Sequence, residues 1–122
     1  MTLPPCPSSA TNCVSTEATE RCHAVAPFLL ARAAAWPAIR AAVVALPRTR
    51  IVEEGADFLR VECRTILFRF VDDLVIQLRL DRNDLAIRSA SRLGHYDFGV
   101  NRRRVESLRR RLEARGAIKA SA

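Results

Sequence analysis

The chain has few of the features that mark common functional classes. Its 122 residues include one Trp, one Tyr and five Phe, so it offers few aromatic faces on which nucleic-acid bases stack. It has neither a Walker-type nor a dinucleotide-type glycine loop for nucleotide phosphates. No Gly-x-Ser-x-Gly elbow surrounds a serine. These absences argue against nucleotide-dependent enzymes, elbow-type serine hydrolases and base-stacking nucleic-acid-binding domains.

Long apolar runs are also missing. Arg32 and Arg40 interrupt the apolar stretch of residues 24–46, well short of the ~20 residues that a membrane span needs. Residues 1–6 have neither a basic start nor an apolar run, so no signal peptide is expected. With 49% hydrophobic residues and this length, the sequence predicts one soluble domain with its own core.

Acidic residues are scarce in the last third of the chain. Residues 86–122 carry nine Arg and Lys119 against three acidic residues, which accounts for the whole formal net charge of +7. In residues 1–85, ten Arg and ten acidic residues cancel. The basic field therefore belongs to the C-terminal part. Because charge alone gives only salt-sensitive, unspecific binding, nucleic acid is not an expected partner.

The four cysteines form no Cys-x-x-Cys pair, so no metal site is expected from their spacing. Cys6 and Cys13 flank a short Pro/Ser-rich segment and are candidates for a disulfide in an oxidising compartment. Cys63 alternates with apolar residues, which favours a buried thiol. Cys22 and His23 are residue types found in reactive-thiol sites and in metal sites. Neighbours in sequence need not point toward one another, however, so a packing role is preferred for them.

The pattern of apolar residues predicts an α+β domain over residues 27–116, after an irregular Pro/Ser/Cys-rich lead-in (residues 1–26) and before a tail (117–122). One helix (37–46) is expected before the sheet and an Arg-rich helix (100–115) after it, each carrying an apolar stripe at helical spacing. Between them we expect a four-stranded antiparallel sheet, with strands at about 50–53, 58–64, 66–80 and 85–91. Phe28 to Leu30 is a further candidate for a short strand.

The third predicted strand contains a conflict. A regular pleat places Asp72 on the core face, among apolar residues of the same parity. A buried unpaired carboxylate is costly, so either a bulge turns Asp72 away or a donor meets it. Asp73 points to the opposite face, so the two carboxylates do not form a hydrolytic pair.

The turn at residues 81–84 suggests a register for the last hairpin. If Leu80 pairs with Leu85, then Gln77 faces Arg88 and Asp73 faces Arg92 on the outer face of the sheet. That face would then carry the charged residues Arg60, Glu62, Arg64, Arg69, Asp73, Arg88 and Arg92.

Two interpretations of these charges compete. In the first, the carboxylates of Asp72 and Asp73 accept hydrogen bonds from three arginines, Arg88, Arg92 and Arg104. These bonds form a structural ion-pair network that fixes strand to helix. In the second, the three arginines face a phosphate, a carboxylate or a lipid head group. A catalytic interpretation, with His95 as base and Ser89, Ser91 or Asp73 as its partner, is less favoured because a strand serine is poorly exposed for attack.

Three pieces of sequence resemble the motifs of a family catalogued as domain of unknown function 1499, and the similarity runs from about Pro5 to Arg111. The first is Cys6-Pro7-Ser8-Ser9 followed by Asn12-Cys13-Val14-Ser15, and the second is Phe70-Val71-Asp72-Asp73. The third is Arg88-Ser89-Ala90-Ser91-Arg92 with Gly94, Asp97, Gly99, Asn101 and Arg104. The resemblance implies an exported, membrane-attached or chloroplast setting, and it implies no activity, because the family has no agreed one.

The preferred hypothesis is a non-catalytic accessory or binding domain without a cofactor. Its candidate site for a ligand or partner consists of Asp72, Asp73, Arg88, Ser89, Ser91, Arg92, Asn101 and Arg104. One alternative is a small subunit of a larger membrane-associated complex, such as a photosynthetic or respiratory one. The other is a small hydrolase or transferase that uses His95 with Ser89 or Asp73.

Overall fold

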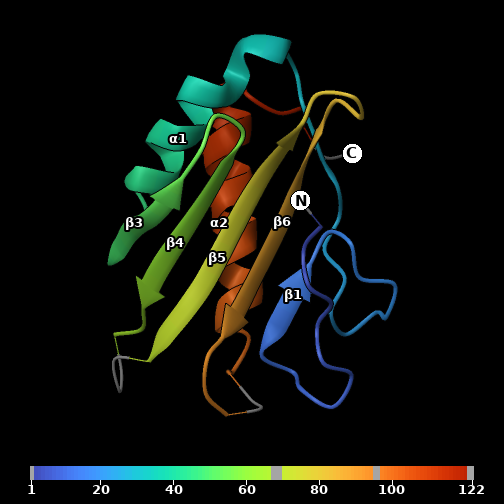
Figure 1. Ribbon diagram of the computed structural model, residues 1–122, viewed down its shortest axis with the longest axis vertical. Coiled ribbons are helices and arrows are strands. Elements are labelled where there is room, and N and C mark those ends of the chain that lie inside the picture. The colour runs from blue at the N-terminus through green and yellow to red at the C-terminus, as the bar shows by residue number, and fades with distance from the viewer. Residues whose placement is uncertain (1, 67–69, 95–96, 121–122) are drawn as a thin grey trace.

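The computed structural model describes residues 2–66, 70–94 and 97–120. Within these residues, six strands form one antiparallel sheet in the order β1-β6-β5-β4-β3, and β2 also pairs with β6 (Figure 1). The strands are β1 (Cys13–Ser15), β2 (Phe28–Leu29), β3 (Thr49–Glu54), β4 (Phe58–Arg64), β5 (Val71–Arg79) and β6 (Asp84–Ser91). The α+β class and the antiparallel sheet are thus confirmed.

The prediction of a four-stranded sheet was wrong, because β1 was missed and β2, which matches the further candidate strand Phe28 to Leu30, also joins the sheet. β1 lies inside the lead-in and has three residues, while β2 has two. Both pair with β6, β1 along Arg88 to Ala90 and β2 along Asp84 and Leu85. Such short strands carry no readable alternation, and they precede the first helix, so the predicted order of helix before sheet holds only for β3 to β6.

Of the long predicted strand at 66–80, the structure confirms β5 from Val71 to Arg79, and residues 67–69 lie outside the described residues. The hairpin register differs from the prediction by two residues. Leu78, rather than Leu80, pairs with Leu85, so Arg88 lies opposite Val75 and Gln77 lies opposite Ala86. A shift of two residues keeps every side chain on its predicted face, because side chains alternate with a period of two.

Two α-helices cover one face of the sheet within the described residues. A short 3-10 turn (Ala33–Ala35) leads into α1 (Trp36–Val44), and α2 (Val100–Ala114) follows β6. Both helices lie behind the sheet in the view of Figure 1. The expected helical stripes are buried: Ile39 and Val43 on α1, and Val105, Leu108 and Leu112 on α2. The core therefore lies between this helix layer and the sheet. Among the described residues, only the lead-in covers part of the other face, which we call the open face.

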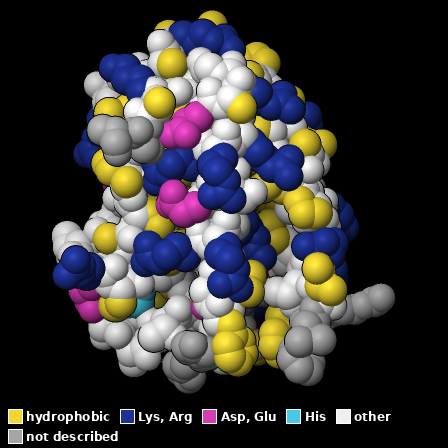
Figure 2. Space-filling model, turned by 180° about the vertical axis from the view of Figure 1, so that it is seen from behind, with side chains coloured by type: hydrophobic (Ala, Val, Ile, Leu, Met, Phe, Trp, Pro, Cys, Tyr) yellow, Lys and Arg dark blue, Asp and Glu magenta, His cyan; other side chains and the backbone are white. Residues whose placement is uncertain are grey.

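The arginines of α2 divide into two groups. Arg102, Arg104 and Arg109 reach inward to backbone carbonyls or carboxylates. Those on the outer side, Arg103, Arg110, Arg111 and Arg115, are exposed, and they contribute to the basic side chains scattered over the helix side of the molecule (Figure 2). In the part of the chain that the structure describes, no helix is long and apolar enough to cross a membrane.

Candidate functional site

The sheet separates the predicted site residues into two groups. Asp72, Ser89 and Ser91 point toward the core, where Asn101 and Arg104 meet them from α2. Asp73, Arg88 and Arg92 lie on the open face. Asp72 and Asp73 take opposite sides because successive side chains of a strand alternate. The structure therefore divides the one candidate site into two clusters of side chains on opposite faces of the sheet.

The conflict in the third predicted strand is resolved by a donor and not by a bulge. Asp72 is 1% exposed, and its Oδ2 accepts a hydrogen bond from Arg104 Nη2 at 2.8 Å. The Arg104 side chain is only 12% exposed, so the pair is largely removed from water. Asp72 Oδ1 meets no donor among the described residues. Among the described residues, the guanidinium of Arg104 is therefore the group that compensates the negative charge of Asp72.

Asn101, at the start of α2, is the centre of the core-side group. Its Oδ1 accepts from Ser89 Oγ at 2.6 Å and from Arg104 Nη1 at 2.8 Å. Its Nδ2 donates to the backbone oxygen of Asn12, to Ser91 Oγ and to Asp97 Oδ2. This buried network ties the lead-in, β6 and the first turn of α2 together. Its geometry is that of a structural lock, as the first interpretation of the charges predicts for Asp72 and Arg104.

Two members of this lock lie outside the predicted site list. Asn12 Nδ2 donates to the carbonyls of Leu93 and Gly94, and Asp97 accepts the backbone N–H groups of Gly99 and Asn101. The Asp97 side chain therefore satisfies one free N–H group in the first turn of α2, that of Asn101, and the N–H of Gly99 just before the helix. The signal for both was the resemblance, in which Asn12 and Asp97 already stood within the motifs.

On the open face, Arg92 joins two acidic residues. It donates to both oxygens of Asp73, at 2.8 and 2.9 Å, and to Glu62 at 2.6 Å. The hydrogen bond from Arg92, followed by that from Arg50, lowers the pKa of Glu62. The predicted contact between Asp73 and Arg92 is present, although the two residues lie diagonally across the strands, since Asp73 pairs with Ala90. Arg92 is thus already bonded to carboxylates.

Arg88 differs from Arg92 because no carboxylate among the described residues is bonded to it. Its Nη2 donates to the backbone oxygen of Pro5 at 3.3 Å, and its Nε is buried and meets no acceptor among the described residues. Burial lowers the pKa of Arg88, and the charge of Asp73 only partly opposes this effect. Arg88 is therefore a partly desolvated cation whose charge is incompletely compensated.

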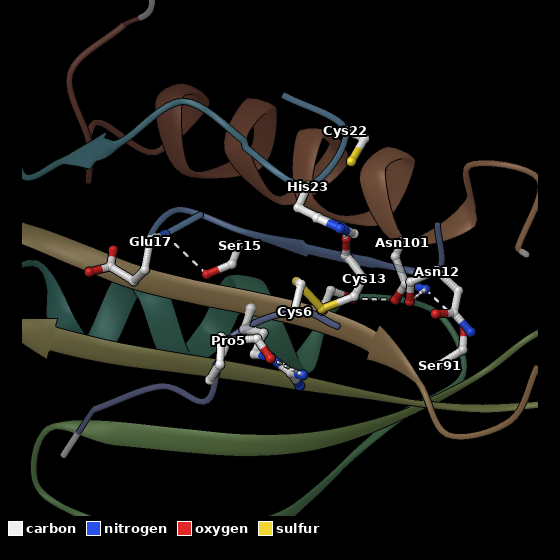
Figure 3. The surroundings of a disulfide bond; sticks show 12 residues. Pro5, Cys6, Asn12, Cys13, Ser15, Glu17, Cys22, His23, Ser91 and Asn101 are labelled. Atoms are coloured by element: carbon white, nitrogen blue, oxygen red, sulfur yellow. Dashed lines mark hydrogen bonds between the residues drawn. A yellow bond between two sulfur atoms is a disulfide. The ribbon is translucent and has the colours of Figure 1, made fainter. Parts of the chain in front are cut away.

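Arg88 and Arg92 line a hollow of about 240 Å³ on the open face. The other wall is the loop between Cys6 and Cys13, which are joined by a disulfide (Figure 3). β1 anchors this loop, because Cys13 pairs with Ala90 on β6. Among the described residues, the charged groups lining the hollow are Arg88, Arg92 and Asp73. Asp73 and Glu62 already compensate Arg92, so the positive potential that suits the hollow to an anion comes from Arg88.

Three of the residues proposed for catalysis, Ser89, Ser91 and Asp73, are described, and each is already hydrogen-bonded. Ser89 is fully buried and donates to Asn101, so a substrate cannot reach its Oγ. Asp73 is held by Arg92. Ser91 Oγ accepts from Asn101. His95 lies outside the described residues.

These features define a class of protein: a small α+β domain with a buried Asp–Arg–Asn lock and an arginine-lined hollow beside a disulfide loop. The family described as "Protein of unknown function (DUF1499)" matches residues 2–112. The chain belongs to this family, as the resemblance of its motifs predicts. No curated protein and no solved structure gives a match.

Proposed function

We propose that this chain is a non-catalytic binding domain that receives an anionic group, a carboxylate or a phosphate, in the hollow lined by Arg88 and Arg92. The observation that carries the proposal is Arg88 itself. Its guanidinium is partly buried, bonds one backbone oxygen at 3.3 Å and has no acceptor at Nε among the described residues. A cation held in this way gains most from a new anionic acceptor.

The surroundings of Arg88 favour binding of a ligand over internal compensation. The carboxylate of Asp73 acts on Arg88 only through space, because both of its oxygens bond to Arg92. Arg92, the more exposed of the two arginines, lies at the rim of the hollow, and an incoming anion would bond to Arg88 in preference to it. The planar guanidinium fork suits the paired oxygens of a carboxylate or phosphate. The disulfide loop limits how far the lead-in wall of the hollow can move.

The test is a calorimetric titration of the whole chain with inorganic phosphate and with acetate at low ionic strength. We expect saturable binding that Arg88→Met weakens roughly tenfold to 100-fold, the effect of losing a charge-assisted hydrogen bond. Arg92→Met should weaken it less, because Arg92 is already bonded to Asp73 and Glu62.

The matched control is Arg60→Met, which removes the same charge from the same face of the sheet. Arg60 pairs with Glu53 at 3.3 Å and does not line the hollow. This control should bind like the unmodified chain. Equal weakening by Arg60→Met and Arg88→Met would reduce the effect to net charge, and unchanged binding by Arg88→Met would refute the site.

A second candidate function, a small subunit of a larger membrane-associated complex, is supported by exposed apolar side chains at one end of the sheet. Ile66, after β4, is 76% exposed, and Leu93 and Phe98, between β6 and α2, are 74% and 75% exposed. Exposed apolar residues gathered at one end are typical of interaction surfaces. Native mass spectrometry of material isolated gently from its source would show a stoichiometric partner if this candidate is right and a lone chain if it is wrong.

A further inference from the structure

The turn at Glu20 to His23 brings three side chains with metal-binding atoms together. One carboxylate oxygen of Glu20, the Sγ of Cys22 and a ring nitrogen of His23 lie within 4.8 Å of one another. Glu20 and Cys22 are exposed, whereas His23 is 1% exposed. The sequence placed Cys22 beside His23 without showing that they converge, and the turn supplies that convergence along with the carboxylate.

The hydrogen bonds of His23 fix which ring nitrogen is free. Nδ1 lies 2.9 Å from the backbone oxygen of Cys13. A carbonyl oxygen only accepts, so Nδ1 carries the proton and Nε2 carries the lone pair. Nε2 is buried, and no described residue donates to it. Figure 3 shows His23 beside Cys13, with Cys22 close by. A buried imidazole oriented through Nδ1, with an unused lone pair on Nε2, is the usual arrangement of a metal ligand.

The turn is held from two sides before any ion binds. Within the turn, the N–H groups of His23 and Ala24 donate to the Glu20 carbonyl at 3.0 and 2.9 Å. On one side, Ser15 of β1 donates its N–H to the His23 carbonyl at 2.8 Å. On the other side, Arg102 of α2 donates to the carbonyls of Cys22 and Ala24. Little backbone ordering is therefore needed to assemble the site, which favours binding.

We propose that Glu20, Cys22 and His23 bind a divalent transition-metal ion, with Zn²⁺ the best match to one oxygen, one sulfur and one nitrogen ligand. Zinc bond lengths of about 2.0–2.3 Å require ligand atoms roughly 3.3–3.8 Å apart in a tetrahedron. The three atoms lie within 4.8 Å of one another, so the distance still to be closed is at most about 1.5 Å. Glu20 and Cys22 are exposed, so their side chains are free to move by this amount. As the Zn–S bond forms, the Cys22 thiol releases its proton to solvent.

Three protein ligands leave one position of the tetrahedron for water or a partner's side chain. Glu20 and His23 also line a hollow of about 220 Å³ between the turn and residues 3–6. The Cys13 carbonyl that orients His23 belongs to the disulfide-bonded Cys13 of β1. The site is separate from the Arg88 hollow, and neither proposal depends on the other.

The experiment is a titration of the intact chain with Co²⁺ and then Zn²⁺, under argon and without reductant, so that Cys22 stays a thiol and the Cys6–Cys13 disulfide stays closed. We expect one ion per chain, with a sulfur-to-cobalt charge-transfer absorption that Zn²⁺ abolishes. Zinc affinity is then measured by competition with a chromophoric chelator.

Three variants make the test specific to these ligands. Cys22→Ser should remove the charge-transfer absorption and weaken zinc binding on the order of 100-fold, since even residues that only orient ligands are worth 10–100-fold. His23→Asn keeps a donor for the Cys13 carbonyl but loses the Nε2 ligand, and it should weaken binding as much. Cys63→Ala removes the other free thiol, which is buried in the core, and should change neither readout.

Several outcomes would overturn the proposal. One is the lack of saturable one-to-one binding by the unmodified chain, and another is a charge-transfer band that survives Cys22→Ser. A third is His23→Asn keeping full affinity while its circular dichroism melt shows it folded. Arg88→Met serves as a separate control and should leave zinc affinity unchanged, so failure of the anion site and failure of the metal site are distinguishable.

Discussion

Removing the Arg104 side chain tests the buried lock most severely. Arg104→Ala leaves the Asp72 carboxylate, which is 1% exposed, without the guanidinium that bonds its Oδ2 at 2.8 Å. Breaking a buried ion pair by deleting one partner costs about 3–5 kcal/mol, because the remaining charge stays uncompensated. Against a total stability of roughly 5–15 kcal/mol, this is a large fraction. For a chain of this size, the melting temperature should fall by about 10–20 °C.

The assay is urea unfolding followed by circular dichroism, with two comparison variants. The double variant Asp72→Leu/Arg104→Met removes both charges and should recover at least half of the loss, because replacing a buried pair by apolar side chains is often close to neutral. Arg60→Ala breaks an exposed pair with Glu53 and should cost at most ~1 kcal/mol. The structural account is refuted if Arg104→Ala costs no more than Arg60→Ala, or if the double variant is no more stable than the single one.

Three further predictions concern the disulfide and two titrating groups. The double variant Cys6→Ser/Cys13→Ser opens a disulfide loop with a sequence separation of 7, and it should lower the free energy of unfolding in denaturant by about 2–3 kcal/mol. It should also weaken phosphate binding, because one wall of the Arg88 hollow is then free to move. Unchanged phosphate binding would show that the loop is not part of the site. Burial raises the pKa of the Cys63 thiol from 9.0 to about 11. The stability contributed by the buried thiol is therefore full below pH 9 and is lost as the pH rises toward 11. In thermal melts across this range, Cys63→Ala should lack this loss of stability. The hydrogen bond from Arg79 is the largest influence on the Glu17 carboxyl and lowers its pKa below 4.5. The stability that this pair contributes is present above pH 4.5 and is lost on further acidification, so the stability of Glu17→Gln should depend less on pH in this range. An identical pH dependence would show that the pair does not contribute to stability.

Side-chain parity made the faces of the sheet predictable. Asp72 on the core side, and Asp73, Arg88 and Arg92 on the outer side, follow from alternation alone. These assignments survived the register error because it amounted to two residues. The pairing itself was not predictable, because the turn begins at Leu80, one residue earlier than the polar run at 81–84 indicates. Arg79 pairs with Asp84, and Asn83 adopts a positive φ of 55°.

The lead-in was the least predictable part of the fold. β1 has three residues, and its place beside β6 depends on contacts far along the chain, such as that between Asn12 and Asn101, 89 residues apart. Local pattern carries no information on such pairings. For the same reason, the sequence grouped Arg104 with Arg88 and Arg92, whereas the sheet lies between them. The incomplete compensation of the Arg88 charge was not predicted either, since it depends on which carboxylates are bonded to Arg92.

The measurement that tests the central claim most directly is an NMR titration of the ¹⁵N-labelled chain with inorganic phosphate, observing the arginine Nε and backbone signals. The binding-domain account predicts saturable shifts at Arg88 Nε, Arg92 and the Cys6 to Cys13 loop, and their loss in Arg88→Met while Arg60→Met keeps them. Shifts that do not saturate, that spread over the exposed arginines of α2, or that persist in Arg88→Met would contradict it.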